Sequence, residues 1–172
     1  PGLSARFEWN FVRPFMYTHS DTYQNYAHFG QPLAHPFGSN FQELILHVER
    51  DHGRWYHGMR ASMAWLGTDT DRSYGNNIFR PERDRPRKED NSGWVDYGYR
   101  VGQIDPYSLL HAELRSGWLV DPHTGTRLEA SYLMRLTTNV DNSTDLANVF
   151  RVGLVCHFRE RHPEQEVRYV LN

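Results

Sequence analysis

The chain has 172 residues and a formal net charge of −2, so no bulk positive field draws it to nucleic acid. Its mean hydropathy is −0.74, and no apolar run approaches the roughly 20 residues that a membrane-spanning helix needs. A single cysteine excludes an internal disulfide framework. Aromatic residues nevertheless make up 14% of the chain. Amphipathic strands account for both the low mean hydropathy and the high aromatic content, because only every second residue of a strand faces a given side.

Six segments alternate apolar and polar residues, which predicts an all-β fold built as an antiparallel meander. In chain order they cover about residues 5–17, 41–50, 54–66, 107–120, 127–138 and 149–158. The fifth segment is the clearest, because Leu128 and Tyr132 fall on one face and Arg127 and Arg135 on the other, with Leu133 as the exception. One apolar and one charged face per strand is typical of a transmembrane outer-membrane β-barrel.

The tryptophans are spaced as a barrel requires. Trp55 and Trp65 share the apolar face of the third segment, from which His57 departs, and they are ten positions apart. At about 3.3 Å per residue and a tilt near 40°, this spacing spans about 25 Å, the height of a barrel's apolar band. We therefore expect aromatic girdles at the two ends of the band, formed by Trp9, Trp55, Trp65 and Trp118.

The connections alternate in length, as barrel hairpins do, with short periplasmic turns and long extracellular loops. Turns at 50–54 and 121–126 are short. Residues 1–158 are thus expected to form the barrel portion, with 159–172 as a periplasmic tail. The connections expected on the extracellular side are 20–40, 67–106 and 139–148.

Six strands are fewer than the eight of the smallest single-chain barrels. We therefore expect the wall to be completed by missing strands or by other chains. A position before Pro1 is favoured for those strands, because the first segment begins almost at Pro1.

Motifs in the connections point to a family. They are Arg13-Pro-Phe-Met-Tyr-Thr-His19, Asn25-Tyr-Ala-His28-Phe-Gly-Gln31-Pro-Leu-Ala-His35-Pro-Phe-Gly38-Ser-Asn40-Phe, Tyr74-Gly-Asn-Asn-Ile78, Asp96-Tyr-Gly-Tyr-Arg-Val-Gly-Gln103 and Leu119-Val-Asp-Pro-His-Thr-Gly-Thr-Arg-Leu-Glu129. Together they resemble the C-terminal part of the Wzi-like capsule-assembly outer-membrane proteins of Bacteroidetes, a family that includes gliding-motility-associated relatives. The resemblance implies a bacterial outer-membrane β-barrel and a link to surface polysaccharide, and it brings no catalytic residues.

The loop at 20–40 holds the candidate ligand-binding residues. Its aromatic rings can stack on sugars while histidine and amide groups supply hydrogen bonds; the alternative is that the rings pack the loop onto the barrel rim. The candidates are Tyr26, His28, Gln31, His35 and Asn40. His19, His28 and His35 suggest a metal, but no carboxylate or thiolate completes an obvious set, so neither metal nor cofactor is predicted.

The charged faces carry both signs, which favours a filled interior over a strongly ion-selective pore. Their members are Arg6, Glu8, Glu43, His47, Glu49, Arg60, Glu113, Arg115, Arg127, Glu129, Arg135 and Arg151. Carboxylate pairs are common in barrel linings and no nucleophile motif accompanies them, so we predict no enzyme.

The sequence thus predicts an outer-membrane barrel with a structural or surface role: capsule or exopolysaccharide attachment, or a scaffold in a motility or secretion assembly. The expected partners are outer-membrane lipid and lipopolysaccharide, surface polysaccharide, and other outer-membrane or periplasmic subunits, but no nucleic acid. The alternatives are a passive pore or transporter barrel and a soluble carbohydrate-binding β-sandwich.

Overall fold

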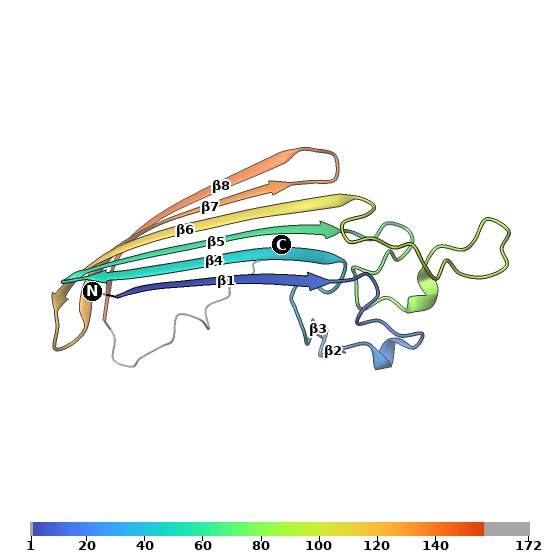
Figure 1. Cartoon of the computed structure of the whole chain (residues 1–172), viewed down its shortest axis with the longest axis horizontal. Helices are drawn as coiled ribbons and strands as arrows, with labels where there is room; N and C mark the ends of the chain where they lie inside the picture. The colour runs from blue at the N-terminus through green and yellow to red at the C-terminus, as the bar shows by residue number, and fades with distance from the viewer. Residues whose placement is uncertain (1, 157–172) are drawn as a thin grey trace.

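The body of the protein is a single antiparallel sheet in the computed structural model, which describes residues 2–156 (Figure 1). Six strands follow one another in the order β1-β4-β5-β6-β7-β8, so the predicted all-β meander is confirmed. Their bounds are β1 Leu3–Val12, β4 Phe41–His52, β5 Trp55–Gly67, β6 Pro106–Asp121, β7 Thr126–Thr138 and β8 Thr144–Val155. No helix in this part of the chain is long and apolar enough to cross a membrane.

The strand register sorts the side chains onto two chemically different faces. Residues that are paired across an antiparallel ladder share a face, and one such row runs Trp9, Leu44, Met63, Leu110 and Leu136. The neighbouring row on the other side runs Asn10, Glu43, Ala64, Leu109 and Thr137. We call the first side the outer face and the second the inner face. His57 and Leu133 fall on the outer and inner faces respectively, as the sequence predicts.

Two tight turns join consecutive strands at one end of the sheet. Gly53 and Gly125 adopt φ values of 61° and 64° in these turns, a region that glycine enters without the steric cost of a Cβ. At the opposite end, β7 and β8 are joined through Asn142, whose φ is 61°. We refer to these as the short-turn end and the loop end.

Two predicted boundaries are wrong. The first strand ends at Val12 rather than near residue 17, because the chain turns away at Pro14, which has no amide hydrogen for the ladder. The sixth strand begins at Thr144 rather than at 149, so the predicted loop 139–148 shrinks to the turn at 139–143. The predicted outward position of Phe158 lies outside the described residues.

The long connections contain only short elements. A 3-10 turn, η1 (Thr22–Gln24), precedes a two-stranded ribbon of β2 (Ala27–His28) and β3 (Gln31–Pro32). A second 3-10 turn, η2 (Glu82–Asp84), lies in the other connection. Both connections lie at the loop end, at the right of the sheet and partly below it in Figure 1.

The buried hydrophobic core lies where these connections meet the inner face. It consists of Phe37 from the first connection with Phe41, Ala64 and Leu66 from β4 and β5. Partly buried Val12, Tyr107 and Leu109 pack against this cluster.

Candidate functional site

The connections 13–40 and 68–105 fold together into one unit, which we call the cap. Asn40 lies at its centre, is fully buried and adopts a φ of 60°. Its side-chain amide donates to the Gly67 carbonyl at 3.1 Å, and its Oδ1 accepts from the Gly102 amide at 3.0 Å. Asn40 therefore ties the start of β4 to the end of β5 and to the second connection.

Asn76 and Ser39 form a second tie between the two connections. The Asn76 side chain donates to the carbonyls of Phe37 at 3.2 Å and Ser39 at 2.7 Å. The Ser39 hydroxyl donates to the carbonyl of Gly75, which adopts a φ of 83°. Asp69 organises this turn, because its carboxylate accepts from three backbone amides, those of Tyr74, Asn76 and Asn77.

Asn25 and Phe15 form a third tie. Asn25 is buried, accepts from the His19 amide and donates to the Ile78 carbonyl at 2.6 Å. Phe15 packs edge-on against Tyr99 at 4.9 Å between centroids, with the Arg85 guanidinium 4.7 Å from the centre of its ring. The buried Tyr99 hydroxyl has no hydrogen-bond partner among the described residues, and burial raises the pKa of Tyr99.

Three of the motifs that carry the family resemblance therefore contact one another in space. The motif at 25–41 is bonded to the one at 74–78 through Asn25 and Asn76. It is bonded to the motif at 96–103 through Asn40 and Gly102. From the sequence, Asn25 is expected to help the loop histidines to hydrogen-bond the folded loop, whereas Asp69 and Asn76 are not among the predicted residues. The available signal was a cluster of Asn, Asp and Ser next to glycines, residue types that fold loops by bonding to nearby backbone.

His35 anchors the cap to the sheet. The Phe37 amide donates to its Nδ1 at 3.2 Å, so Nδ1 is unprotonated and the neutral ring carries its proton on Nε2. Nε2 lies 3.1 Å from Oε2 of Glu43, a fully buried residue that also accepts from the Asn10 side chain at 3.2 Å. The His35 ring stacks on Phe41 at 4.4 Å. Two of the predicted ligand-binding residues, His35 and Asn40, are thus engaged in holding the cap together.

The other three predicted ligand residues lie on the cap surface. His28 and Gln31 are direct partners across the β2–β3 ribbon, whose turn residues Phe29 and Gly30 both have positive φ. Tyr26, which is exposed, lies beside Tyr17. The described residues include no group of three or more His, Cys, Asp or Glu side chains that could hold a metal ion.

Several aromatic rings of the cap point into solvent. Tyr23, Phe29 and Tyr97 are 96%, 94% and 90% exposed. Phe29 contacts only the neighbouring His28 ring among the aromatic contacts of the described residues, in contrast to buried Phe37, which packs in the core. Packing of the loop onto the sheet therefore explains Phe37 but not these three rings.

The inner face of the sheet carries several ion pairs. Arg6–Glu8, Arg115–Glu113 and Arg127–Glu129 pair along single strands, at 2.7, 3.3 and 3.3 Å. Arg151 of β8 reaches Glu113 of β6 at 3.6 Å. Tyr56 donates to Glu49 at 3.0 Å. All of these residues were predicted to face inward, apart from Tyr56, and the register places them there.

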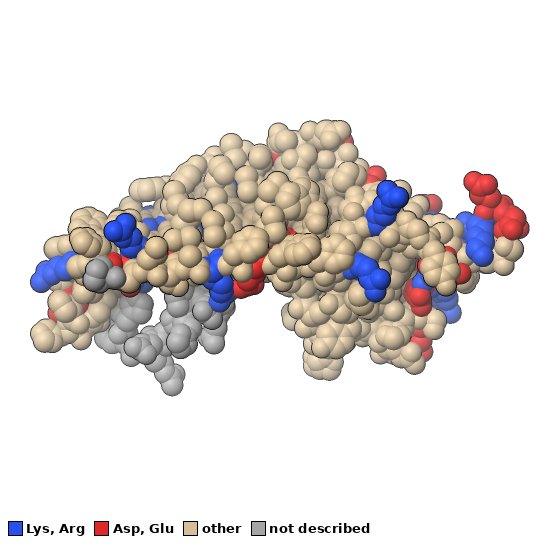
Figure 2. All heavy atoms as spheres, viewed as in Figure 1, with Lys and Arg blue, Asp and Glu red and all other residues tan. Residues whose placement is uncertain are grey.

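The outer face is apolar and uncovered. Seventeen of its large apolar side chains are between 36% and 71% exposed: Leu3, Phe7, Trp9, Phe11, Leu46, Trp55, Met59, Met63, Leu114, Trp118, Val120, Leu128, Tyr132, Leu146, Phe150, Val152 and Leu154. In Figure 2 the surface over the upper strands is largely tan, whereas blue and red atoms lie at the two ends and along the lower edge of the sheet. No second sheet among the described strands faces this surface.

The four tryptophans proposed as girdles lie toward the two ends of the outer face. Trp55 and Trp118 are direct partners at the short-turn end. Trp65 lies in the row of Phe11 and Gln42 at the loop end. Trp9 lies one outer row nearer the middle and contacts Phe11, with 6.1 Å between the ring centroids.

Comparison with known proteins identifies no relative: neither a protein-family model, nor a curated protein, nor a solved structure matches the chain.

Proposed function

We propose that this chain forms part of the wall of a transmembrane β-barrel in a bacterial outer membrane, with its outer face toward lipid. The observation that carries the proposal is the uncovered outer face. Soluble monomeric proteins rarely expose contiguous apolar patches larger than a few hundred Å². A barrel wall requires such a face, and it requires the charged residues to lie on the opposite, lumen side.

The small size of the buried core supports the same proposal. Within residues 2–156, the buried apolar side chains are Phe37, Phe41, Ala64, Leu66 and Ile78. A water-soluble domain of about 150 residues removes roughly two thirds of its surface from water and buries most of its large apolar side chains. Here those side chains lie on the outer face, so hydrocarbon is the environment that can stabilise them.

The dimensions of the outer face fit a bilayer. Its central rows are almost wholly apolar, and polar rows bound them: Gln42, Ser108 and Thr138 at the loop end, and Arg50, His57 and Ser116 at the short-turn end. Gln42 and Arg50 are eight positions apart on β4. At about 3.3 Å per residue and a tilt near 40°, this is about 20 Å along the membrane normal. The row of Trp55 and Trp118, one outer row beyond Arg50, extends the span toward the usual 25 Å.

Asn148 is the polar residue within the central rows, and its hydrogen bonding suits this environment. The Tyr132 hydroxyl donates to Asn148 Oδ1 at 2.7 Å, so each side chain satisfies part of the other's hydrogen-bonding capacity on the apolar face. Unsatisfied polar groups are costly in hydrocarbon.

The two sheet edges indicate that the wall continues. Among the described strands, β1 and β8 each pair on one side only. Open edges do not occur in the hydrocarbon region, because water is absent there and every backbone group must be bonded within the protein. Further strands are therefore required beside β1 and β8, and each must be antiparallel to continue the meander.

The cap favours a structural or surface role over a passive pore. It is bonded to the inner face through His35, Glu43 and Asn10 and shares a buried core with β4 and β5. We propose attachment of capsule or exopolysaccharide, or a scaffold role in an outer-membrane assembly. The resemblance of the cap motifs to the Wzi-like capsule-assembly family supports this choice.

Extraction of membranes tests the barrel proposal. The protein should stay in the membrane fraction through high salt and sodium carbonate and be released by detergent. Release by carbonate alone would refute the membrane assignment. Planar-bilayer recording of the detergent-purified protein then separates the roles: steady conductance would favour the pore, and silence supports the capped barrel.

The exposed rings of the cap favour a second function, contact with surface polysaccharide. Aromatic rings stack on sugar faces, and the rings of Tyr23, Phe29 and Tyr97 are almost fully exposed. His28 and Gln31 beside Phe29 can donate hydrogen bonds to hydroxyl groups. Pull-down with isolated capsular polysaccharide should retain the protein and should lose it with Phe29→Ala. The matched control is Leu33→Ala, which removes another exposed apolar side chain of the cap.

A further inference from the structure

The outer face contains one formally charged side chain in its lipid-facing rows. This side chain is Arg50. The register of the described strands places no further Lys, Arg, Asp or Glu on this face between the row of Trp55 and Trp118 and the row of Phe11 and Trp65. Arg50 forms no ion pair and no side-chain hydrogen bond with the residues that the structure describes. A lone cation on a lipid-facing surface needs an anionic partner or access to water.

Arg50 belongs to a row of three polar side chains. It pairs directly with His57 of β5, which pairs with Ser116 of β6. Ser116 Oγ lies 3.1 Å from His57 Nδ1. When the serine hydroxyl donates to Nδ1, the His57 proton is on Nε2, which adds a second donor close to the guanidinium. The His57 ring lies parallel to that of Trp55, with 6.0 Å between ring centroids and 4° between planes.

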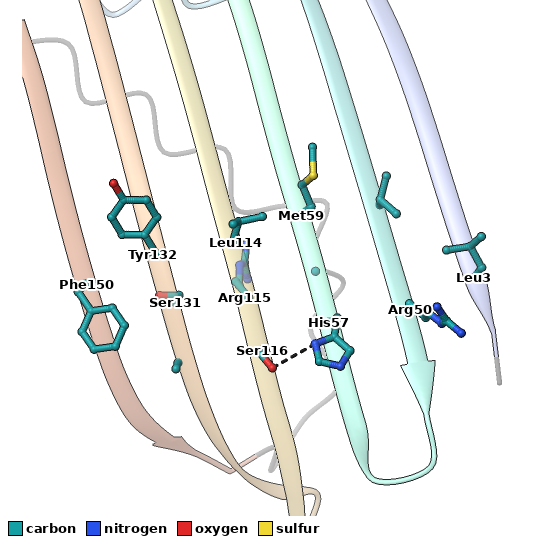
Figure 3. A pocket seen from close by; sticks show the side chains of 13 residues that line it. Leu3, Arg50, His57, Met59, Leu114, Arg115, Ser116, Ser131, Tyr132 and Phe150 are labelled. Atoms are coloured by element: carbon teal, nitrogen blue, oxygen red, sulfur yellow. Dashed lines mark hydrogen bonds between the residues drawn. The ribbon is translucent and has the colours of Figure 1, made fainter.

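These three side chains lie in a shallow depression that crosses the sheet (Figure 3). Its open volume is about 600 Å³. Met59, Leu114 and Tyr132 form its wall toward the middle of the sheet, one outer row away from the polar side chains. The depression is therefore polar on the short-turn side and apolar on the side facing the centre of the band.

We propose that this depression binds an anionic glycerophospholipid of the leaflet at the short-turn end. The Arg50 guanidinium takes the phosphate, since its planar fork matches phosphate oxygens. His57 and Ser116 supply further hydrogen-bonding groups. The acyl chains extend over Met59 and Leu114 toward the middle of the band. This proposal rests on the membrane embedding proposed above.

Charge and depth both favour an anionic headgroup. The surrounding rows hold no carboxylate that could neutralise Arg50 from the same face. The row also lies at the end of the apolar band, where lipid phosphates are found, and a charged side chain there costs about 0–1 kcal/mol rather than the 2–4 of the midplane. A zwitterionic lipid offers the same phosphate but no net charge.

The test uses the full chain in dodecyl maltoside micelles, which carry no phosphate, with phosphatidylglycerol added. Native mass spectrometry measures the fraction of protein that retains a lipid. Arg50→Gln should weaken phosphatidylglycerol binding about fivefold, as expected for loss of one interfacial charge-assisted contact. Arg151→Gln, which makes the same change on the inner face, should leave binding within about twofold of wild type.

The lipid-binding results separate the lipid site from the membrane assignment. Equal binding by Arg50→Gln and wild type, or an equal loss in Arg151→Gln, would overturn the lipid site. Displacement of the lipid by excess inorganic phosphate would show a site for free phosphate instead and would also overturn it. Equal retention of phosphatidylethanolamine would remove the preference for net negative charge. If the chain remains outside the micelles, the membrane assignment fails as well; if it enters them, only the lipid site is at stake.

Discussion

Replacing Ala61 by arginine tests the assignment of the two faces. Ala61 lies on the outer face, four positions from the polar row at His57 and four from Trp65 at the loop end. At about 3.3 Å per residue and a tilt near 40°, each gap corresponds to about 10 Å along the membrane normal. Ala61→Arg therefore puts a guanidinium near the midplane, where it should lower the free energy of unfolding by about 2–4 kcal/mol. Urea-induced unfolding in lipid vesicles, followed by tryptophan fluorescence, measures this loss.

The matched control is the next residue, Ser62, which faces the opposite way. It lies on the inner face, between Ile45 and His111, in a row that also holds Arg135. Ser62→Arg should cost less than about 1 kcal/mol, the usual scale of one added charge in a solvated, mixed-charge setting. Ala61→Gln separates the charge from the size of the new side chain. Equal losses at 61 and 62, or a larger loss at 62, would refute the facing on which the barrel proposal depends.

The remaining predictions concern the cap. Gly67→Ala should expose the amides of the cap to hydrogen exchange, because a Cβ there would overlap the Gln103 carbonyl and the Asn40 side chain; Gly93→Ala, whose Cβ meets no atom within 4 Å, should not. Asn40→Ala should also increase hydrogen exchange in the cap, because the hydrogen bonds of the Asn40 side chain are lost. Asn40→Gly loses the same hydrogen bonds, but glycine adopts the positive φ without strain, so this variant measures the effect of the hydrogen bonds alone. Tyr99→Phe should raise cap stability by about 1 kcal/mol, because it removes a buried hydroxyl that has no partner among the described residues. Thermal unfolding measures this gain. Burial raises the pKa of Tyr99, so above about pH 10 this tyrosine loses its proton more readily in the unfolded chain than in the folded protein. The wild type should therefore lose stability as pH rises above about 10, and Tyr99→Phe should lose less.

The sequence was sufficient to predict the sheet and its two faces. A strand repeats every two residues, so alternation alone decides which side chains share a face. This holds even for the exceptions, since His57 and Leu133 occupy the faces that their positions require. The start of β8 could not be predicted in this way. Asp145 lies on the inner face, where a charged residue fits the alternation. Asn148 lies on the outer face and interrupts its apolar pattern, which favours a loop in the sequence, whereas in the structure Asn148 accepts a hydrogen bond from Tyr132 within the sheet.

The cap could not be predicted from periodicity, because hydrogen bonds from side chains to backbone determine its fold. Asn25, Asn40 and Asn76 each bond to carbonyl groups between 27 and 53 residues away in the sequence. Nothing in the sequence distinguishes these asparagines from residues available to a ligand. For that reason Asn40 and His35 were grouped with His28 as candidates, although the first two lie inside the cap and the third on its surface.

The shared core explains why the cap is better understood as a fixed closure than as a movable lid. Phe37 of the cap packs at 5.6 Å, edge-on, against Phe41 of β4, so the cap and the sheet do not have separate interiors. Lifting the cap would expose these rings and would also leave the fully buried Glu43 without its His35 partner. Burying an aromatic side chain contributes on the order of 2 kcal/mol, so exposing these rings to water would be costly. If the sheet is part of a barrel wall as proposed, an open lumen at this end would require breaking the buried core of the described residues, which is the physical reason to favour a scaffold over a pore.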